Sequence, residues 1–146
     1  MRALAVVNAE GFPKRWEGGP FHHCFEASIQ PYHAQLEAVA DRMTAITGIP
    51  RTEAGPCNVT WKVAADPYVE VPIGCCNSRL FGTDVAIYKA EVTFRFGEFV
   101  LGGAAHESGH VLGLAHSPVK TDLMWIDGSG DFSRDELAVL AWIYGR

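Results

Sequence analysis

Three histidines near the C-terminal end of the chain have the spacing of a metal site. His106 and His110 are four residues apart, so on a helix they project from one face about one turn apart. Gly113 can adopt a left-handed conformation that ends such a helix, and His116 can then approach the same ion from outside it. Three imidazoles that leave one coordination position open are typical of a catalytic zinc site.

Glu107 directly follows the first of these histidines. Its carboxylate lies beside the ligand face, where it can reach a water molecule in the open position without binding the metal itself. We therefore expect Glu107 to act as a general base. The alternative is a buried helix with incidental histidines. The eleven-residue pattern argues against it, because it fixes more positions than the short His-Glu-x-x-His motif, which matches many unrelated helices.

The pattern His106-Glu107-Ser108-Gly109-His110 continues to Leu114-Ala115-His116-Ser117 and is followed by Asp122-Leu123-Met124-Trp125, a candidate Met-turn. From about Gly102 to Gly145 the chain resembles the matrixin branch of the metzincin zinc endopeptidases. Upstream of this segment the resemblance rests only on the order of the expected elements.

The resemblance implies an α+β fold. A twisted, mixed β-sheet of about four to five strands would pack on an N-terminal helix and on the zinc-binding helix, with a C-terminal helix after the Met-turn. Met124 would form an apolar floor beneath one catalytic zinc ion rather than bind it. Residues 117 to 127 would line the pocket for the substrate side chain that follows the scissile bond.

The implied function is a zinc-dependent endopeptidase that hydrolyses extended polypeptides with a zinc-bound water activated by Glu107. A zinc amidase or small-peptide hydrolase is an alternative, and a non-catalytic zinc-containing binding module is another. The intact Glu107 counts against the binding module, because a structural site needs ligands but no base. Asp127-Gly128-Ser129-Gly130-Asp131 gives calcium only weak support, since it lacks the distal glutamate of a calcium loop and is typical of a plain turn.

Composition excludes some partners. The chain has 146 residues and a formal net charge of −5, with no basic cluster, so we expect no nucleic-acid partner. No apolar run approaches the roughly 20 residues that span a bilayer. We expect a monomeric single domain, residues 1–146, that acts on a peptide or polypeptide, with residues 1–20 as an N-terminal arm.

The cysteines are even in number, at positions 24, 57, 75 and 76. Two disulfides in a secreted protein would explain them; four reduced thiols in a cytoplasmic protein are the alternative. Because adjacent cysteines rarely pair, we expect Cys24 and Cys57 each to bond to one of Cys75 and Cys76. A cysteine-bound structural zinc is disfavoured, since no Cys-x-x-Cys pair is present.

Periodicity and turn residues predict the elements that must position the site. Strands are expected at residues 3–8 (or an arm there), 21–27, 58–63, 84–88 and 91–96, a helix at 31–47 ended by Gly48, a loop at 65–79, and a zinc helix that begins at 99–103. Ser133 and Glu136 form a capping box at the start of the last helix.

Two further expectations concern individual strands. A run between Ser78 and Phe96 should be the sheet edge above the cleft, where a peptide can add as an extra strand, unless a loop merely covers that edge. His22 and His23 point to opposite faces of their strand, so we interpret them as surface or packing residues rather than as ligands of one metal.

Overall fold

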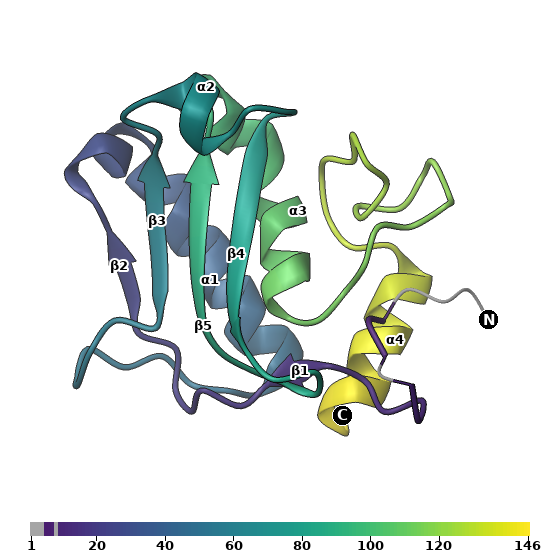
Figure 1. The fold of residues 1–146 in the computed structure, drawn as a ribbon. Helices are drawn as coiled ribbons and strands as arrows, with labels where there is room; N and C mark the ends of the chain where they lie inside the picture. Colours follow the sequence, from purple (N-terminus) through teal and green to yellow (C-terminus); the bar gives the residue numbers. More distant parts are fainter. Residues whose placement is uncertain (1–4, 8) are drawn as a thin grey trace.

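A mixed five-stranded β-sheet forms the centre of the fold in the computed structural model, which describes residues 5–7 and 9–146 (Figure 1). The strands are β1 (Arg15–Trp16), β2 (His23–Phe25), β3 (Val59–Val63), β4 (Cys76–Gly82) and β5 (Ala86–Phe94). The strand order is β1-β5-β3-β2, and β4 pairs with β5 on the edge opposite β1, since Ile87 of β5 pairs with both Trp16 and Gly82. Only β4 is antiparallel among these pairings. The expected α+β fold is confirmed.

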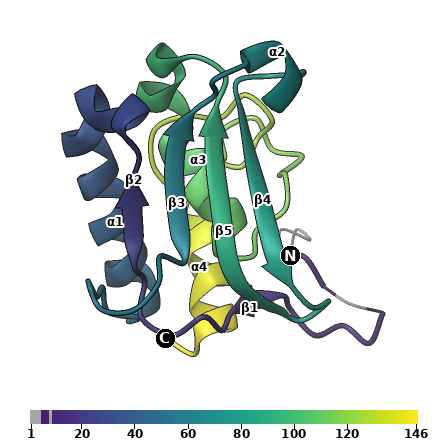
Figure 2. The same ribbon diagram turned by 60° about the vertical axis from the view of Figure 1, so that its left-hand side comes forward.

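The three longer α-helices lie on one face of this sheet (Figure 2). The α-helices are α1 (His33–Thr47), α2 (Pro67–Glu70), α3 (Val100–Val111) and α4 (Arg134–Tyr144), with 3-10 helices η1 (Ala27–Tyr32) and η2 (Gly97–Phe99). The helices α1 and α3 lie side by side behind the sheet, and α4 packs on α1 (Figures 1 and 2). Within the described ranges, no helix has the length and apolar character needed to cross a membrane.

The core lies between the sheet and the helices. Trp61 of β3 stands opposite Val92 of the parallel strand β5, and both side chains are fully buried. Leu36 and Met43 of α1 and Val111 of α3 close the same cluster from the helical side. This sheet-on-helix core fixes where α3 lies, and therefore where its histidines are presented.

Several expected elements are confirmed. The helix α1 ends at Thr47 as expected, and Gly48 caps it with a left-handed φ of 75° while its N–H donates to Thr44 O. Its start differs, because Pro31 lies in η1 and α1 begins at His33. The strand β3 and the start of α3 lie close to their expected positions. At α4 the Ser133 hydroxyl accepts from the N–H of Glu136 while the Glu136 carboxylate accepts from the N–H of Ser133, so the capping box is formed.

Three expectations about the sheet are wrong. Residues 65–79 contain the short helix α2 and the first part of β4 rather than only a loop, and the two expected strands at 84–88 and 91–96 are one continuous strand, β5. The expected strand at 21–27 shortens to β2. For residues 3–8 the sequence left a strand or an arm open. Ala5 and Val7 form only isolated bridges, which favours the arm, and residues 3, 4 and 8 lie outside the described residues.

Candidate metal centre

The three predicted histidines converge. The helix α3 ends at Val111, and Gly113 then adopts a φ of 101° while its N–H donates to His110 O over 3.0 Å. The chain reverses there and brings His116 against the helix. Ring centroids are 5.0 Å apart for His106 and His110, 5.3 Å for His106 and His116, and 4.9 Å for His110 and His116. One ligand nitrogen from each ring lies within 4.8 Å of the others, so the cluster could hold a metal ion.

Backbone carbonyls orient two of these rings. His106 Nδ1 lies 2.7 Å from Leu123 O, and His110 Nδ1 lies 2.9 Å from Leu114 O. A carbonyl oxygen can only accept, so each Nδ1 carries the proton and each Nε2 keeps a free lone pair. This is the usual outer-shell arrangement of metal-binding histidines. Burial lowers the pKa of His110 to about 4 and also lowers the pKa of His106, so both rings are neutral at pH 7.

Glu107 lies on the same side as these free nitrogens. Its carboxylate is buried, with one oxygen 3.9 Å from His106 Nε2 and 3.8 Å from His110 Nε2. These distances are too long for hydrogen bonds. Burial raises the pKa of Glu107 to about 7, and the neighbouring imidazoles do not offset the effect because they are themselves neutral. The carboxylate therefore faces the cluster without being tied to it.

Met124 packs beneath the helix that carries the ligands. It is fully buried, and its sulfur lies so close to Gly109 that a Cβ on that glycine would clash with it. The buried carboxylate of Glu136 accepts hydrogen bonds from the N–H groups of Leu123 and Met124, each over 2.8 Å. The sequence identified Glu136 as a capping residue but not as the anchor of this turn.

A cleft of about 910 Å³ opens beside the cluster. It is lined by Ser78 and Leu80 of β4 on one side and by Glu107 and His110 of α3 on the other. Among the described strands β4 pairs only with β5, so it is an edge strand of the sheet. The sequence did not determine which strand forms the sheet edge at the cleft, and in the structure that strand is β4.

The turn at residues 127–131, which gave calcium weak support in the sequence, does not gather side chains into a further potential metal site among the described residues. Asp131 pairs with Arg42 over 3.2 Å, and its other carboxylate oxygen accepts from the N–H of Phe132 over 2.8 Å. Gly130 has a φ of 97°, as a tight turn requires. The two potential metal clusters found within the described residues both lie elsewhere.

The predicted cysteine pairing is wrong. The disulfides join Cys24 to Cys57 and Cys75 to Cys76. Cys24 lies on β2 and Cys76 begins β4, with β3 and β5 between those two strands. Three strand spacings separate them by roughly 14 Å, whereas the Cα atoms of a disulfide usually lie no more than about 7 Å apart. Because Cys24 cannot reach Cys75 or Cys76, it pairs with Cys57, and the two adjacent cysteines pair with each other.

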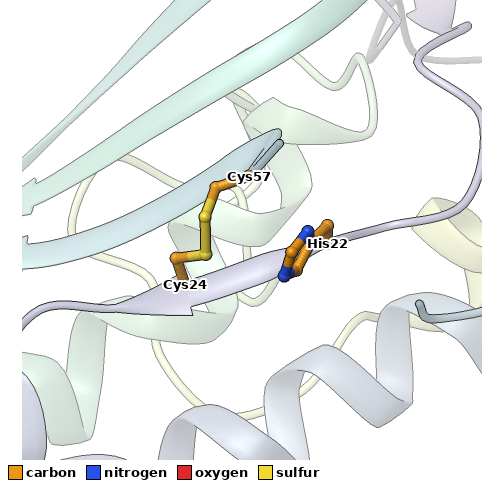
Figure 3. Close-up of side chains that lie close together, drawn as sticks. All are labelled: His22, Cys24 and Cys57. Atoms are coloured by element: carbon orange, nitrogen blue, oxygen red, sulfur yellow. A yellow bond between two sulfur atoms is a disulfide. The ribbon is translucent and has the colours of Figure 1, made fainter. Parts of the chain in front are cut away.

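A second group of side chains that could hold a metal consists of His22 and the two cysteines of the first disulfide (Figure 3). His22, Cys24 and Cys57 each place one ligand atom within 4.8 Å of the others. His23 points to the other face of the chain, is buried, and accepts a hydrogen bond from Trp61 Nε1 over 3.0 Å. The expected placement of His22 and His23 on opposite faces of the chain is confirmed. The His22 group could have been found from its spacing, because His22 and Cys24 are two residues apart.

Comparison with known proteins adds no assignment: no protein-family model matches the chain, and no curated protein matches it. The function must therefore be inferred from the site itself.

Proposed function

We propose that this chain is a zinc-dependent, matrixin-like endopeptidase that hydrolyses peptide bonds in extended polypeptides. One observation carries the proposal. The buried Glu107 carboxylate faces three converging imidazoles at the wall of a cleft that borders a sheet edge. A purely structural metal site has no use for a carboxylate that faces the three imidazoles without binding the metal.

The residues present fit a zinc ion. Zinc accepts neutral imidazole nitrogens, and three protein ligands leave the fourth position open for chemistry. His106 and His110 meet this requirement through their free Nε2 atoms, and His116 completes the set. When bound, zinc supplies a Lewis acid that makes water more acidic and polarises the carbonyl group of the scissile bond.

Glu107 would carry the proton during the reaction. As general base its carboxylate accepts a proton from the attacking water, and as general acid it then delivers that proton to the leaving amine. Burial keeps bulk water away from this carboxylate, which is 4 % exposed. The fixed Nδ1 contacts of His106 and His110 hold the ligand side of the site in place while the proton moves.

The strand β4 supports the choice of an extended substrate. Its unpaired edge borders the cleft, so a substrate backbone can add alongside it through main-chain hydrogen bonds. Such bonds are independent of side-chain identity and suit an enzyme that acts within a polypeptide. Met124 would support the ligand helix from below and make no bond to the metal.

The test is cleavage of a denatured, alkylated protein substrate with and without a zinc chelator. Glu107→Gln should bind zinc as wild type does but lose about 10²- to 10⁴-fold in rate, the usual share of a general base. Glu53→Gln, which changes an exposed carboxylate outside the cleft lining, is the matched control and should cleave normally. Equal cleavage by wild type and Glu107→Gln would refute the mechanism. Cleavage of short peptides alone would favour a small-peptide hydrolase.

A further inference from the structure

We propose that His22, Cys24 and Cys57 form a second metal site, for zinc or another thiophilic divalent cation, when the Cys24–Cys57 disulfide is reduced. The site lies on β2 and on the loop that precedes β3, away from the cleft-lining residues. It does not depend on the proposed peptidase activity.

The backbone holds the three side chains together. Alternation along the extended chain places His22 and Cys24 on one face and the buried His23 on the other. Cys57 is held opposite them by its neighbour Asn58, whose side-chain oxygen accepts from His22 N over 2.7 Å and whose N–H donates to His22 O over 3.1 Å. Figure 3 shows the His22 ring beside the disulfide. The cluster is therefore fixed by main-chain contacts as well as by the sulfur–sulfur bond.

His22 also has a nitrogen without a partner. Its Nδ1 is buried, and no described residue makes a hydrogen bond to it. A buried polar atom left without a partner is destabilising, because it has lost its hydrogen bonds to water. Coordination of a metal by the imidazole would give the ring a partner that the oxidised protein does not provide.

A dithiol or a phosphine can reduce the Cys24–Cys57 disulfide and so free both sulfur ligands. A dithiol gives two electrons and two protons to the disulfide, which breaks into two thiols, and the dithiol closes to its own disulfide. A phosphine gives the two electrons, water gives the two protons and its oxygen, and the phosphine leaves as the phosphine oxide. A divalent cation then displaces the two thiol protons and binds both thiolates, and the His22 imidazole supplies the third ligand. Two thiolates and one imidazole are a donor set that zinc favours.

The metal would replace the disulfide as a cross-link. Both join β2 to the residues just before β3, next to the parallel pair His23 and Val59. The same strand register would then be held in an oxidising compartment by sulfur–sulfur bonding and in a reducing one by the metal.

The experiment uses the full chain with Cys75→Ser and Cys76→Ser, so that the remaining thiols are those of the proposed site. Cobalt(II) is titrated into oxidised and phosphine-reduced protein, and thiolate-to-metal charge-transfer absorption is recorded. The three-imidazole cluster cannot produce this absorption because it contains no sulfur. We expect the band only after reduction, with saturation at no more than two equivalents per chain, because the three-imidazole cluster can also take up cobalt without adding to the band.

The contribution of His22 is tested in the same assay. His22→Ala should weaken cobalt binding at least tenfold, whereas His33→Ala, a change of an exposed histidine on α1, should leave it unchanged. Circular dichroism follows folding throughout. The proposal is overturned if reduced protein shows no charge-transfer band, if His22→Ala binds as tightly as its parent, or if the reduced chain stays unfolded with cobalt present from the start.

Discussion

At the scale of residues, the site depends on which nitrogen each histidine presents. Leu123 O and Leu114 O accept hydrogen bonds from the Nδ1–H groups of His106 and His110, so the free Nε2 atoms face the side on which Glu107 lies. Losing an outer-shell partner of this kind typically lowers metal affinity 10- to 100-fold. Losing one of the three imidazoles should therefore lower metal affinity by more than this.

The first prediction concerns the ligand outside the helix. His116→Ala should lower zinc affinity by more than about 100-fold, because only two imidazoles remain. The exposed His33→Ala is the control and should leave affinity unchanged. Competition with a chromophoric chelator measures both in the oxidised protein. Equal affinities for wild type and His116→Ala would show that His116 does not bind the metal.

The convergence of the three histidines could be predicted because their spacing acts through local geometry. One helical turn relates His106 to His110, and a glycine with positive φ brings in His116. The cysteine pairing could not be predicted in this way. It depends on which strands lie between Cys24 and Cys76, and the order of strands is a property of the whole sheet.

At the scale of elements, α3 is held between the sheet and the turn at Met124. Gly109 is the point of closest approach, because a Cβ there would meet the Met124 sulfur and then the Phe132 ring. Gly102 lies on the same helix with nothing within 4 Å of its potential Cβ. The same substitution to alanine can therefore be compared at a crowded position, Gly109, and at an open one, Gly102.

The second prediction uses this pair. Gly109→Ala should displace Met124, destabilise the fold by about 1–3 kcal/mol through overpacking, and reduce zinc affinity at least tenfold. Gly102→Ala should stabilise it by up to about 1 kcal/mol with unchanged zinc affinity. Urea unfolding and metal competition measure the two effects. If the variants behave alike, the contact with Met124 does not support the site.

The third prediction concerns α4. The Tyr144 hydroxyl accepts from Trp16 N over 2.9 Å and donates to Leu112 O over 2.8 Å, and so joins α4 to β1 and to the end of α3. Tyr144→Phe leaves both buried groups unpaired and should lower the free energy of unfolding by about 1–3 kcal/mol. Tyr88→Phe, at a half-exposed position, should have little effect. Similar urea midpoints for the two variants would contradict this role.

The same hydroxyl predicts a difference at alkaline pH. Burial raises the pKa of Tyr144 from 10.0 to about 12. Its neutral form is therefore favoured in the folded state, so this stabilisation is complete below pH 10 and is lost as pH rises towards 12. The stability gap between wild type and Tyr144→Phe should narrow over that interval.

Elements with strong local signals could be predicted, and those defined by pairing could not. The residues of β4, Cys76–Gly82, include no β-branched side chain and are strand only because they pair with β5. Within β5 the exposed pair Tyr88 and Lys89 interrupts the alternation and makes one strand resemble two. By contrast, the Ser133–Glu136 capping box is local in sequence and was predicted correctly.

At the scale of the whole molecule, the two disulfides should contribute unequally. Cys24 and Cys57 are 33 residues apart and Cys75 and Cys76 are 1 apart. Loop-closure entropy then gives roughly 4 kcal/mol for the first and about 1 kcal/mol or less for the second. The double variants Cys24→Ser/Cys57→Ser and Cys75→Ser/Cys76→Ser should differ accordingly in urea unfolding without metal. Equal losses would show that closing a long loop is not what stabilises the fold.

The most direct test is zinc reconstitution of the oxidised, chelator-treated wild-type chain. Cleavage of a denatured protein substrate is measured as zinc is added, with Glu107→Gln titrated in parallel. The site of three imidazoles and one carboxylate predicts cleavage that rises to a plateau at one equivalent of zinc per chain. The Glu107→Gln protein should bind the same equivalent and cleave about 10²- to 10⁴-fold more slowly. Full cleavage by the metal-free chain, or zinc binding without any cleavage, would contradict the account.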